Sequence, residues 1–309
     1  EEDVNLAASA SDLDRLFLNV ESPRYGNVTA NLDLERSSEE RRRQYSAYAN
    51  AIIEPHERWR ILFGGRYDDI DESGSDRVSN TNFENFTGVF SPRLGVVFLP
   101  SPIWSFYGSY SESVDPNEGL QPNGTPLIPT QAKSFELGGK WSGFNNQLYA
   151  EASAFHIRQI NVTSDAPGSP GFEIQTAEQR NIGVDLSIET NFDSWINLLG
   201  RYSYIDSEIS NDPEIPNGTA ALNIPKHAGS FTIIVAPRWR NLEGLEFGLN
   251  ASYVGARQGS LDTETIKFEL PSYFKADFFG SWQVSDKLKF SFSIENLSNF
   301  LSLSISREH

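Results

Sequence analysis

Apolar and polar side chains alternate along most of this chain. In the clearest segment every second residue is apolar: Leu288, Phe290, Phe292 and Ile294. Side chains of a β-strand point alternately to opposite faces, so this pattern predicts strands with one apolar and one polar face. The pattern recurs about twelve times along the chain. The predicted strands cover residues 44–54, 59–69, 86–99, 104–114, 132–142, 147–161, 172–190, 195–206, 228–237, 245–259, 273–284 and 288–296.

The connections between these strands alternate between short and long. The short ones, rich in Pro, Gly, Asn, Asp and Ser, are 55–58, 100–103, 143–146, 191–194, 238–244 and 285–287. Such residues accept the backbone angles of turns. The long ones begin near Ile70, Asp115, Val162, Ser207 and Ser260. Outer-membrane barrels combine tight periplasmic turns with long extracellular loops, so the alternation favours a barrel over a soluble β-sandwich.

We therefore predict an all-β fold, a portion of an antiparallel transmembrane β-barrel of about 12 strands. Residues 44–300 are expected to form the strands and residues 301–309 an extracellular-side tail. Residues 1–43 are interpreted as an extracellular loop or the remnant of earlier strands, with Leu16, Leu18 and Val20 hinting at one more strand. The turn pattern places both ends on the extracellular side. We expect other residues to complete the barrel, since unpaired strand edges in lipid cost several kcal/mol per backbone group.

Composition agrees with a barrel and excludes several other classes. The chain of 309 residues is 38% hydrophobic and 12% aromatic, which suits a polar interior with aromatic girdles. No segment approaches the roughly 18 apolar residues of a membrane helix. The absence of cysteine excludes disulfides and thiolate metal sites. A formal net charge of −17 argues against nucleic-acid binding.

No motif for a metal, a cofactor or catalysis survives inspection. The string from Asp69 to Asp76 begins like a calcium loop, but Asn80 stands where the bidentate Glu is needed. His56, His156, His227 and His309 lack zinc-site spacing. No nucleophile elbow is present, and no Asp/Glu pair is singled out as a catalytic dyad. The sequence thus predicts no metal, no cofactor and no enzyme.

Several strings resemble consecutive strands of TonB-dependent siderophore receptors. They include GGRYDDID (64–71), FSPRLGVVFLP (90–100), WSFYGSYSESVDPNEG (104–119), AKSFELGGKW (132–141), AEQRNIGVDLSIE (177–189), YVGARQG (253–259), LPSYFKADFFGSW (270–282) and IENLSNF (294–300). The resemblance implies a 22-stranded bacterial outer-membrane barrel, plugged by an N-terminal domain and energised by the TonB–ExbB–ExbD complex. This chain resembles the C-terminal part of that barrel, without the plug, the TonB box, the early strands or the final strand.

The resemblance also directs attention to the face that would line the barrel lumen. Residues predicted there as ligand-binding candidates are Arg66, Tyr107, Lys140, His156, Arg158 and Arg201. Cations would attract an anionic ferric siderophore, and a tyrosine could stack on it. The alternative is that these cations pair with lumenal carboxylates or with the plug.

Other functions remain as alternatives at this point. The chain could be a structural or adhesive outer-membrane module, an outer-membrane enzyme of the phospholipase or protease type, or an engineered barrel reduced from receptor strands. The last would close if residues 44–54 paired with 288–296. Heme, cobalamin and sugars are alternative cargoes.

Overall fold

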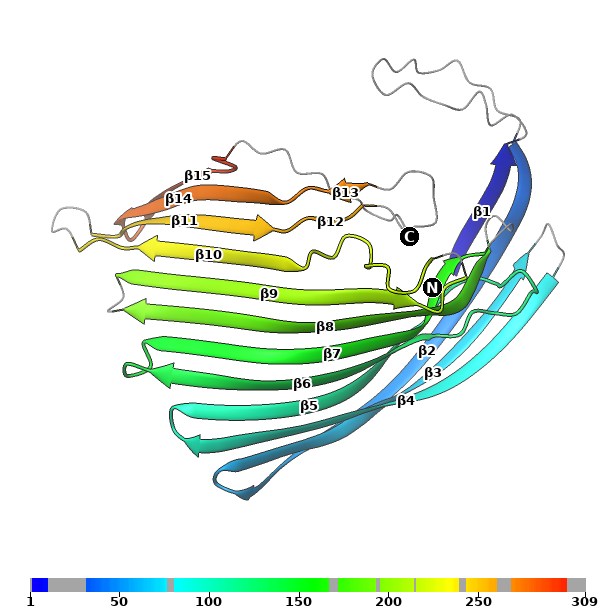
Figure 1. Ribbon diagram of the computed structural model, residues 1–309, viewed down its shortest axis with the longest axis horizontal. Coiled ribbons are helices and arrows are strands. Elements are labelled where there is room, and N and C mark those ends of the chain that lie inside the picture. Colours follow the sequence, from blue (N-terminus) through cyan, green and yellow to red (C-terminus); the bar gives the residue numbers. More distant parts are fainter. Residues whose placement is uncertain are drawn as a thin grey trace, which may run out of the picture.

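The computed structural model describes residues 2–10, 32–76, 81–166, 172–192, 195–213, 215–238, 243–259 and 268–298. All regular elements in these ranges are β-strands. No described segment forms a helix long and apolar enough to cross a membrane. Figure 1 shows the strands as one large curved sheet, with short turns along one end and long connections along the other.

The strands follow one another in chain order. Their bounds are β1 Glu2–Ala10, β2 Leu32–His56, β3 Trp59–Asp76, β4 Thr81–Ser101, β5 Trp104–Asp115, β6 Thr130–Gly143, β7 Leu148–Asp165, β8 Glu173–Phe192, β9 Ile196–Ser210, β10 His227–Val235, β11 Leu245–Val254, β12 Arg257–Gln258, β13 Glu269–Leu270, β14 Tyr273–Ser285 and β15 Leu288–Ile294. Thirteen strands form one antiparallel sheet in the order β1 to β11, β14, β15, and β12 pairs separately with β13.

All twelve predicted strands are present, and several extend further than the sequence pattern suggested. Residues 70–76, expected above to begin a long connection, continue β3 and pair with β4. The predicted strand 245–259 ends at Val254, before the short β12. The sheet also begins earlier than residue 44, because β1 pairs with the first half of β2. Leu16, Leu18 and Val20 lie outside the described residues.

The curved sheet is not closed onto itself. Its edges are β1 and β15, and β2 lies between β1 and β3. The closed twelve-strand alternative, in which 44–54 would pair with 288–296, is therefore wrong for this structure. β1 pairs only with residues 32–41 of β2, while residues 44–53 pair with β3 and with no other described strand.

The two faces of the sheet differ as the alternation predicts. One cavity of about 650 Å³ is lined by Leu62, Arg93, Tyr107, Lys140 and Glu151, which come from five successive strands. A cavity shared by so many strands identifies the concave face, called here the lumenal face. The opposite, outer face presents exposed apolar side chains, of which Leu137 is 70% exposed. Apolar groups that no protein covers are expected where lipid covers them.

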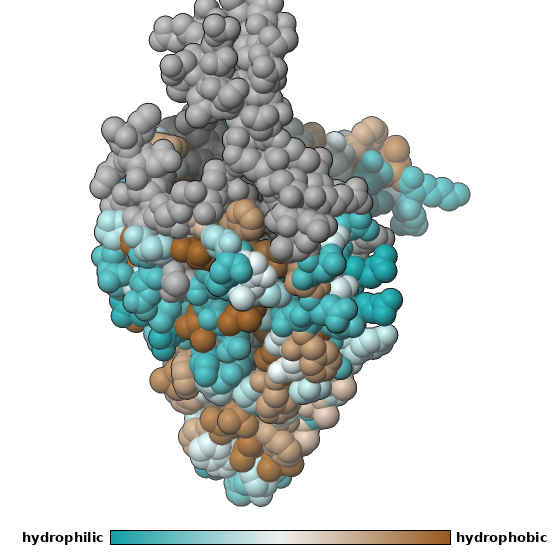
Figure 2. All heavy atoms as spheres, turned by 90° about the vertical axis from the view of Figure 1, so that its right-hand side faces the viewer, coloured by the Kyte–Doolittle hydropathy of each residue, from teal (hydrophilic) through white to brown (hydrophobic). Residues whose placement is uncertain are grey.

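Water-facing residues gather at the end that carries the long connections. Figure 2 views this end, where hydrophilic residues predominate around its middle and hydrophobic residues gather toward the lower edge. The lower edge corresponds to the side of β2 to β4 in Figure 1. The short turns lie at the far end of every strand pair, as a periplasmic location requires.

Candidate functional site

The lumenal face contains two adjoining depressions that share Arg93. The larger is the cavity of about 650 Å³ described above. The smaller has a volume of about 420 Å³, and Tyr48, Asn50, Arg66 and Ser91 contribute to its lining. Polar and aromatic side chains alternate with small ones along this wall. Such a concave surface offers charge and hydrogen bonds to a bulky polar ligand.

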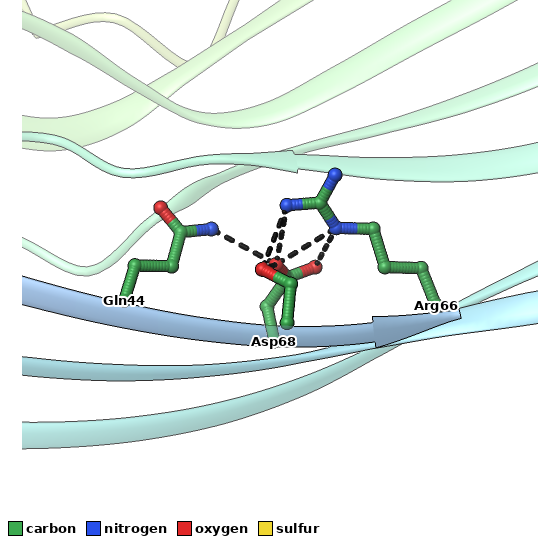
Figure 3. Close-up of polar contacts among 4 residues, drawn as sticks. Gln44, Arg66 and Asp68 are labelled. Carbon is green, nitrogen blue, oxygen red and sulfur yellow. Dashed lines mark hydrogen bonds and ion pairs between the residues drawn. The ribbon is translucent and has the colours of Figure 1, made fainter.

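A buried carboxylate organises the smaller depression. The Asp68 carboxylate accepts hydrogen bonds from Gln44 Nε2 at 2.9 Å, from Ser46 Oγ at 2.6 Å and from Arg66 Nε at 2.8 and 2.9 Å (Figure 3). Only 1% of Asp68 is exposed, whereas about half of the Arg66 side chain is. A carboxylate taken out of water needs such donors. Consequently the charge of Arg66 is already balanced by Asp68.

A second polar cluster lies in the larger depression. The Tyr107 hydroxyl donates a bond shared by Glu136 Oε1, 2.7 Å away, and Glu151 Oε1, 2.9 Å away. Lys140 Nζ lies 3.2 Å from Glu151 Oε1 and 5.3 Å from the centre of the Tyr107 ring. Tyr107 and Lys140 therefore share one face and contact each other, and both are already engaged with carboxylates.

Strand register places the predicted lumenal residues on both faces of the sheet. Arg66, Tyr107, Lys140 and Arg201 lie on the lumenal face, because Ser105 opposes Lys140, Val97 opposes Tyr107, and Ser187 opposes Arg201. That these four contact a ligand stays a prediction.

His156 and Arg158 were assigned to the wrong face. Phe135 opposes His156 and Lys133 opposes Arg158, and these two partners of β6 point outward. Assigning His156 and Arg158 to the lumen implied that Phe155 and Ile157, which alternate with them along β7, face lipid. Phe155 opposes Glu136 and points into the lumen, as does Ile157. A Cβ added at Gly183 of β8 would lie 2.4 Å from Phe155 Cζ, so the ring covers a glycine on the neighbouring strand. The glycine provides the room for an inward aromatic ring.

Arg93 was missed by the sequence reasoning. It opposes Ser111 on the lumenal face and is surrounded in sequence by apolar residues that point outward. Within the described part of the chain, the guanidinium groups of Arg93 and Arg201 have no hydrogen-bond or ion-pair partner. The sequence did carry a signal for its face. Arg93 lies an even number of residues from the polar Ser91, Thr87 and Asn85, and side chains spaced in this way share one face of a strand.

The connection between β5 and β6, residues 116–129, folds against the long-loop end of the sheet. Leu120 and Leu127 within it are 2% and 1% exposed. Gly119 N donates to Glu40 Oε2 of β2 at 2.9 Å, and Ile128 N donates to Gln175 Oε1 of β8 at 2.6 Å. This β5–β6 loop is therefore anchored to strands on both sides of its own hairpin.

Glu72 lies beneath the anchored loop. It is 13 residues beyond Trp59, the first residue of β3, while a transmembrane strand needs about 9–11 residues, so Glu72 lies outside the membrane-spanning segment. Burial raises the pKa of its carboxyl group, and the carboxylates of Glu40 and Glu118 raise it further. A bond donated by Asn85 and the charge of Arg42 act in the opposite direction.

Within the described ranges, no group of three or more His, Asp or Glu side chains is arranged to hold a metal ion. The arrangement of the lumenal wall fits recognition of a ligand by charge and hydrogen bonding.

Comparison with known proteins decides the family. Residues 6–297 match the family model described as TonB dependent receptor-like, beta-barrel. The chain belongs to this family. Its members are outer-membrane transport receptors of Gram-negative bacteria, and the chain is accordingly a portion of an outer-membrane β-barrel.

Curated relatives are similar over most of this chain but are much longer. The metal-pseudopaline receptor CntO of Pseudomonas aeruginosa (strain UCBPP-PA14) is 30% identical over 251 residues, covering 79% of this chain and 35% of that protein. The ferrichrome outer membrane transporter/phage receptor of Escherichia coli (strain K12) is 27% identical over 221 residues, covering 70% of this chain and 28% of that protein. The chain thus spans about a third of the length of the curated relatives it matches.

A solved structure supports the same fold. The siderophore receptor PiuA from Acinetobacter baumannii superposes with a TM-score of 0.76 at 21% identity, covering 94% of this chain and 44% of that one. At this level of identity the similarity concerns the fold. It agrees with a sheet that forms part of a larger barrel.

Proposed function

We propose that this chain is the barrel portion of an outer-membrane receptor that imports ferric siderophores with energy supplied through TonB, ExbB and ExbD. The lumenal wall and the long extracellular connections contact the ligand, and the outer face contacts lipid. No covalent chemistry is assigned to these residues, so the protein is not an enzyme. The contact with TonB belongs to a plug outside this chain.

One observation carries the proposal. In a barrel of this family, Arg93 and Arg201 point to the lumen with no counter-ion in the described part of the chain. Ferric siderophores are often anionic, and cations in a concave wall raise the local concentration of an anionic ligand. Arg66, Tyr107 and Lys140 hold their positions through carboxylates, and we assign them to shaping the wall around those two arginines.

The first test measures ligand binding by the complete receptor. A panel of ferric siderophores is titrated against the purified protein, and tryptophan fluorescence reports the dissociation constant. We expect Arg93→Gln/Arg201→Gln to weaken binding of an anionic ferric siderophore roughly tenfold or more, since a hydrogen bond to a charged group contributes about 1.5–3 kcal/mol. A neutral ferric siderophore should lose less affinity.

The matched control removes two arginines from the outer face. Arg158→Gln/Arg180→Gln changes the net charge equally, and we expect the siderophore dissociation constant to stay within about twofold. Equal weakening by both double variants would contradict the assignment of the lumenal wall, because only a nonspecific charge effect acts on both. Failure of every ferric siderophore to bind the unchanged receptor would refute the proposed function.

A second test separates transport from adhesion. Deletion of residues 116–129 and 211–226 should abolish siderophore binding, and a strain lacking TonB should not accumulate radiolabelled iron through the intact receptor. An adhesive module would keep its partner binding without TonB and would take up no iron. Iron uptake that is unchanged without TonB would contradict the proposed energy source.

A further inference from the structure

Arg42 of β2 lies between carboxylates from two different parts of the chain. Strand register sets Arg42 directly opposite Glu72 of β3, so the two side chains share one face of the sheet. Arg42 nevertheless forms an ion pair with Glu118 of the β5–β6 loop, 76 residues further along the sequence. The cation that holds the loop therefore also faces a second carboxylate on the neighbouring strand.

This place is enclosed, and Glu72 is the most deeply buried of its charged residues. Glu72 is 8% exposed, whereas Glu40 and Arg42 of β2 are half-buried and Glu118 is exposed. Glu40, Glu72 and Glu118 line one cavity of about 20 Å³ together with Arg42. Such a cavity has room for about one water molecule. Three carboxylates and one inward-facing guanidinium group thus meet beneath the loop.

The other neighbours of Glu72 carry no opposing charge on its face. On β4, the neutral Asn85 donates a bond from Nδ2 to Glu72 Oε2 at 3.4 Å. Arg41 also lines the cavity, but it alternates with Arg42 along β2 and belongs to the opposite face. In the part of the chain that the structure describes, Arg42 is therefore the cation on the same face as Glu72.

The charge of Glu72 decides how Arg42 is shared. A neutral carboxyl group needs hydrogen bonds only, and it leaves the guanidinium group of Arg42 to Glu118. A buried carboxylate needs a counter-ion or contact with water. Arg42 is the counter-ion opposite it, and water reaches Glu72 more freely when the loop lifts. Both responses weaken the contact between the loop and β2.

We propose that ionisation of Glu72 releases the β5–β6 loop from β2, because Arg42 turns from Glu118 to Glu72 when the carboxyl proton leaves to water. Burial raises the pKa of Glu72, and the carboxylates of Glu40 and Glu118 raise it further. The closed loop therefore binds this proton more tightly than an open loop, in which Glu72 is in water. Closure is strongest below the ordinary carboxyl pKa and weakens as pH rises through the raised value.

The release acts on one side of the loop. Toward β2, Gly119 N donates to Glu40 Oε2 at 2.9 Å, next to the ion pair that is lost. Toward β8, Ile128 N donates to Gln175 Oε1 at 2.6 Å, a contact without a titratable group. The loop should therefore swing about its β8 side, so that the amide of Gly119 becomes accessible and the amide of Ile128 stays protected.

The test is amide hydrogen exchange in the complete receptor in detergent, followed from pH 5 to pH 8 and corrected for the intrinsic effect of pH on exchange. We expect protection of the Gly119 amide to fall about tenfold or more over this range, because loss of a hydrogen bond to a charged group changes an equilibrium by at least that factor. Protection of the Ile128 amide should change less than about twofold. Glu72→Gln stays neutral and should keep the pH 5 protection of Gly119 up to pH 8.

Two further variants separate the exchange of Arg42 from a general charge effect. Glu84→Gln removes the same charge from an exposed position on β4, opposite Ser73 and on the other face from Asn85, and should leave the pH dependence intact. Glu118→Gln removes the loop's half of the ion pair. It should lower the protection of Gly119 at pH 5 to nearly the value that the unchanged receptor has at pH 8.

Three results would overturn the inference. They are a pH-independent Gly119 amide in the unchanged receptor, the same pH dependence in Glu72→Gln as in the unchanged receptor, and unaltered protection at pH 5 in Glu118→Gln. None of these measurements includes a siderophore, so each result leaves the proposed function untouched.

Discussion

Anchoring of the β5–β6 loop depends on its two buried leucines, and Leu127→Ala tests this dependence. Leu127 is 1% exposed, and the neighbouring Ile128 is 47% exposed. Replacing a buried leucine by alanine costs about 2–5 kcal/mol, and the lower part of that range applies where the surroundings can close around the space. A surface loop can do so, and we therefore expect about 2–3 kcal/mol for local opening of residues 119–127.

Amide hydrogen exchange measures that opening. Within the loop, Gln121 N donates to Thr125 O at 2.8 Å and Leu127 N donates to Gly119 O at 3.1 Å. Exchange of these amides requires the loop to open, so its rate reports the local free energy. At 1.4 kcal/mol per factor of ten, Leu127→Ala should accelerate exchange roughly 30-fold to 150-fold.

Ile128→Ala is the matched control, because it removes the same kind of side chain from the adjacent, exposed position. We expect less than about threefold acceleration from it. Equal acceleration in the two variants would show that burial of Leu127 does not hold the loop. No change in either would mean that the polar contacts with Glu40 and Gln175 suffice.

Three further predictions follow from particular contacts. Asp68→Asn removes the counter-ion of Arg66 and should tighten binding of an anionic ferric siderophore by roughly threefold to fivefold, measured by fluorescence titration; weaker binding would contradict it. The raised pKa of Glu72 means that the folded state holds the proton more strongly, so stability is greatest below the ordinary carboxyl pKa and falls as pH rises through the raised value. Thermal unfolding between pH 4 and 7 should show a smaller decline for Glu72→Gln, and equal declines would refute the linkage. Gly183→Ala places a Cβ 2.4 Å from an aromatic ring and from a backbone carbonyl and should destabilise the barrel by about 1–3 kcal/mol, whereas Gly95→Ala meets only ordinary contacts and should change stability by less than about 0.5 kcal/mol; similar unfolding midpoints would disprove the steric argument.

The existence and order of the strands could be predicted from the sequence. A sheet with lipid on one side and water on the other requires period-two alternation, and the segment from Leu288 to Ile294 shows it without exception. Turn residues then set the short connections. Strand ends were less predictable, because β3 continues to Asp76 through polar residues that no longer contact lipid and so carry no apolar signal.

The face of a side chain could be predicted only where the whole strand was considered. In β7, Ala150, Ala152 and Ala154 mark the outer face and would have placed His156 and Arg158 there. Treating the apolar Phe155 and Ile157 as lipid-facing placed His156 and Arg158 on the lumenal face instead. An aromatic residue can face a polar lumen when a glycine lies beside it on the next strand, and that pairing depends on register.

What the sequence determined by itself is the all-β alternation, the strand order and the family resemblance, because each is written in short segments of chain. Which cations are balanced was decided by the tertiary structure. Arg66 and Arg93 look alike in the sequence, yet Arg66 meets the buried Asp68 and Arg93 meets no counter-ion among the described residues. Whether a cation has a counter-ion depends on which side chains the register between strands brings close in space. A local stretch of sequence does not specify that register.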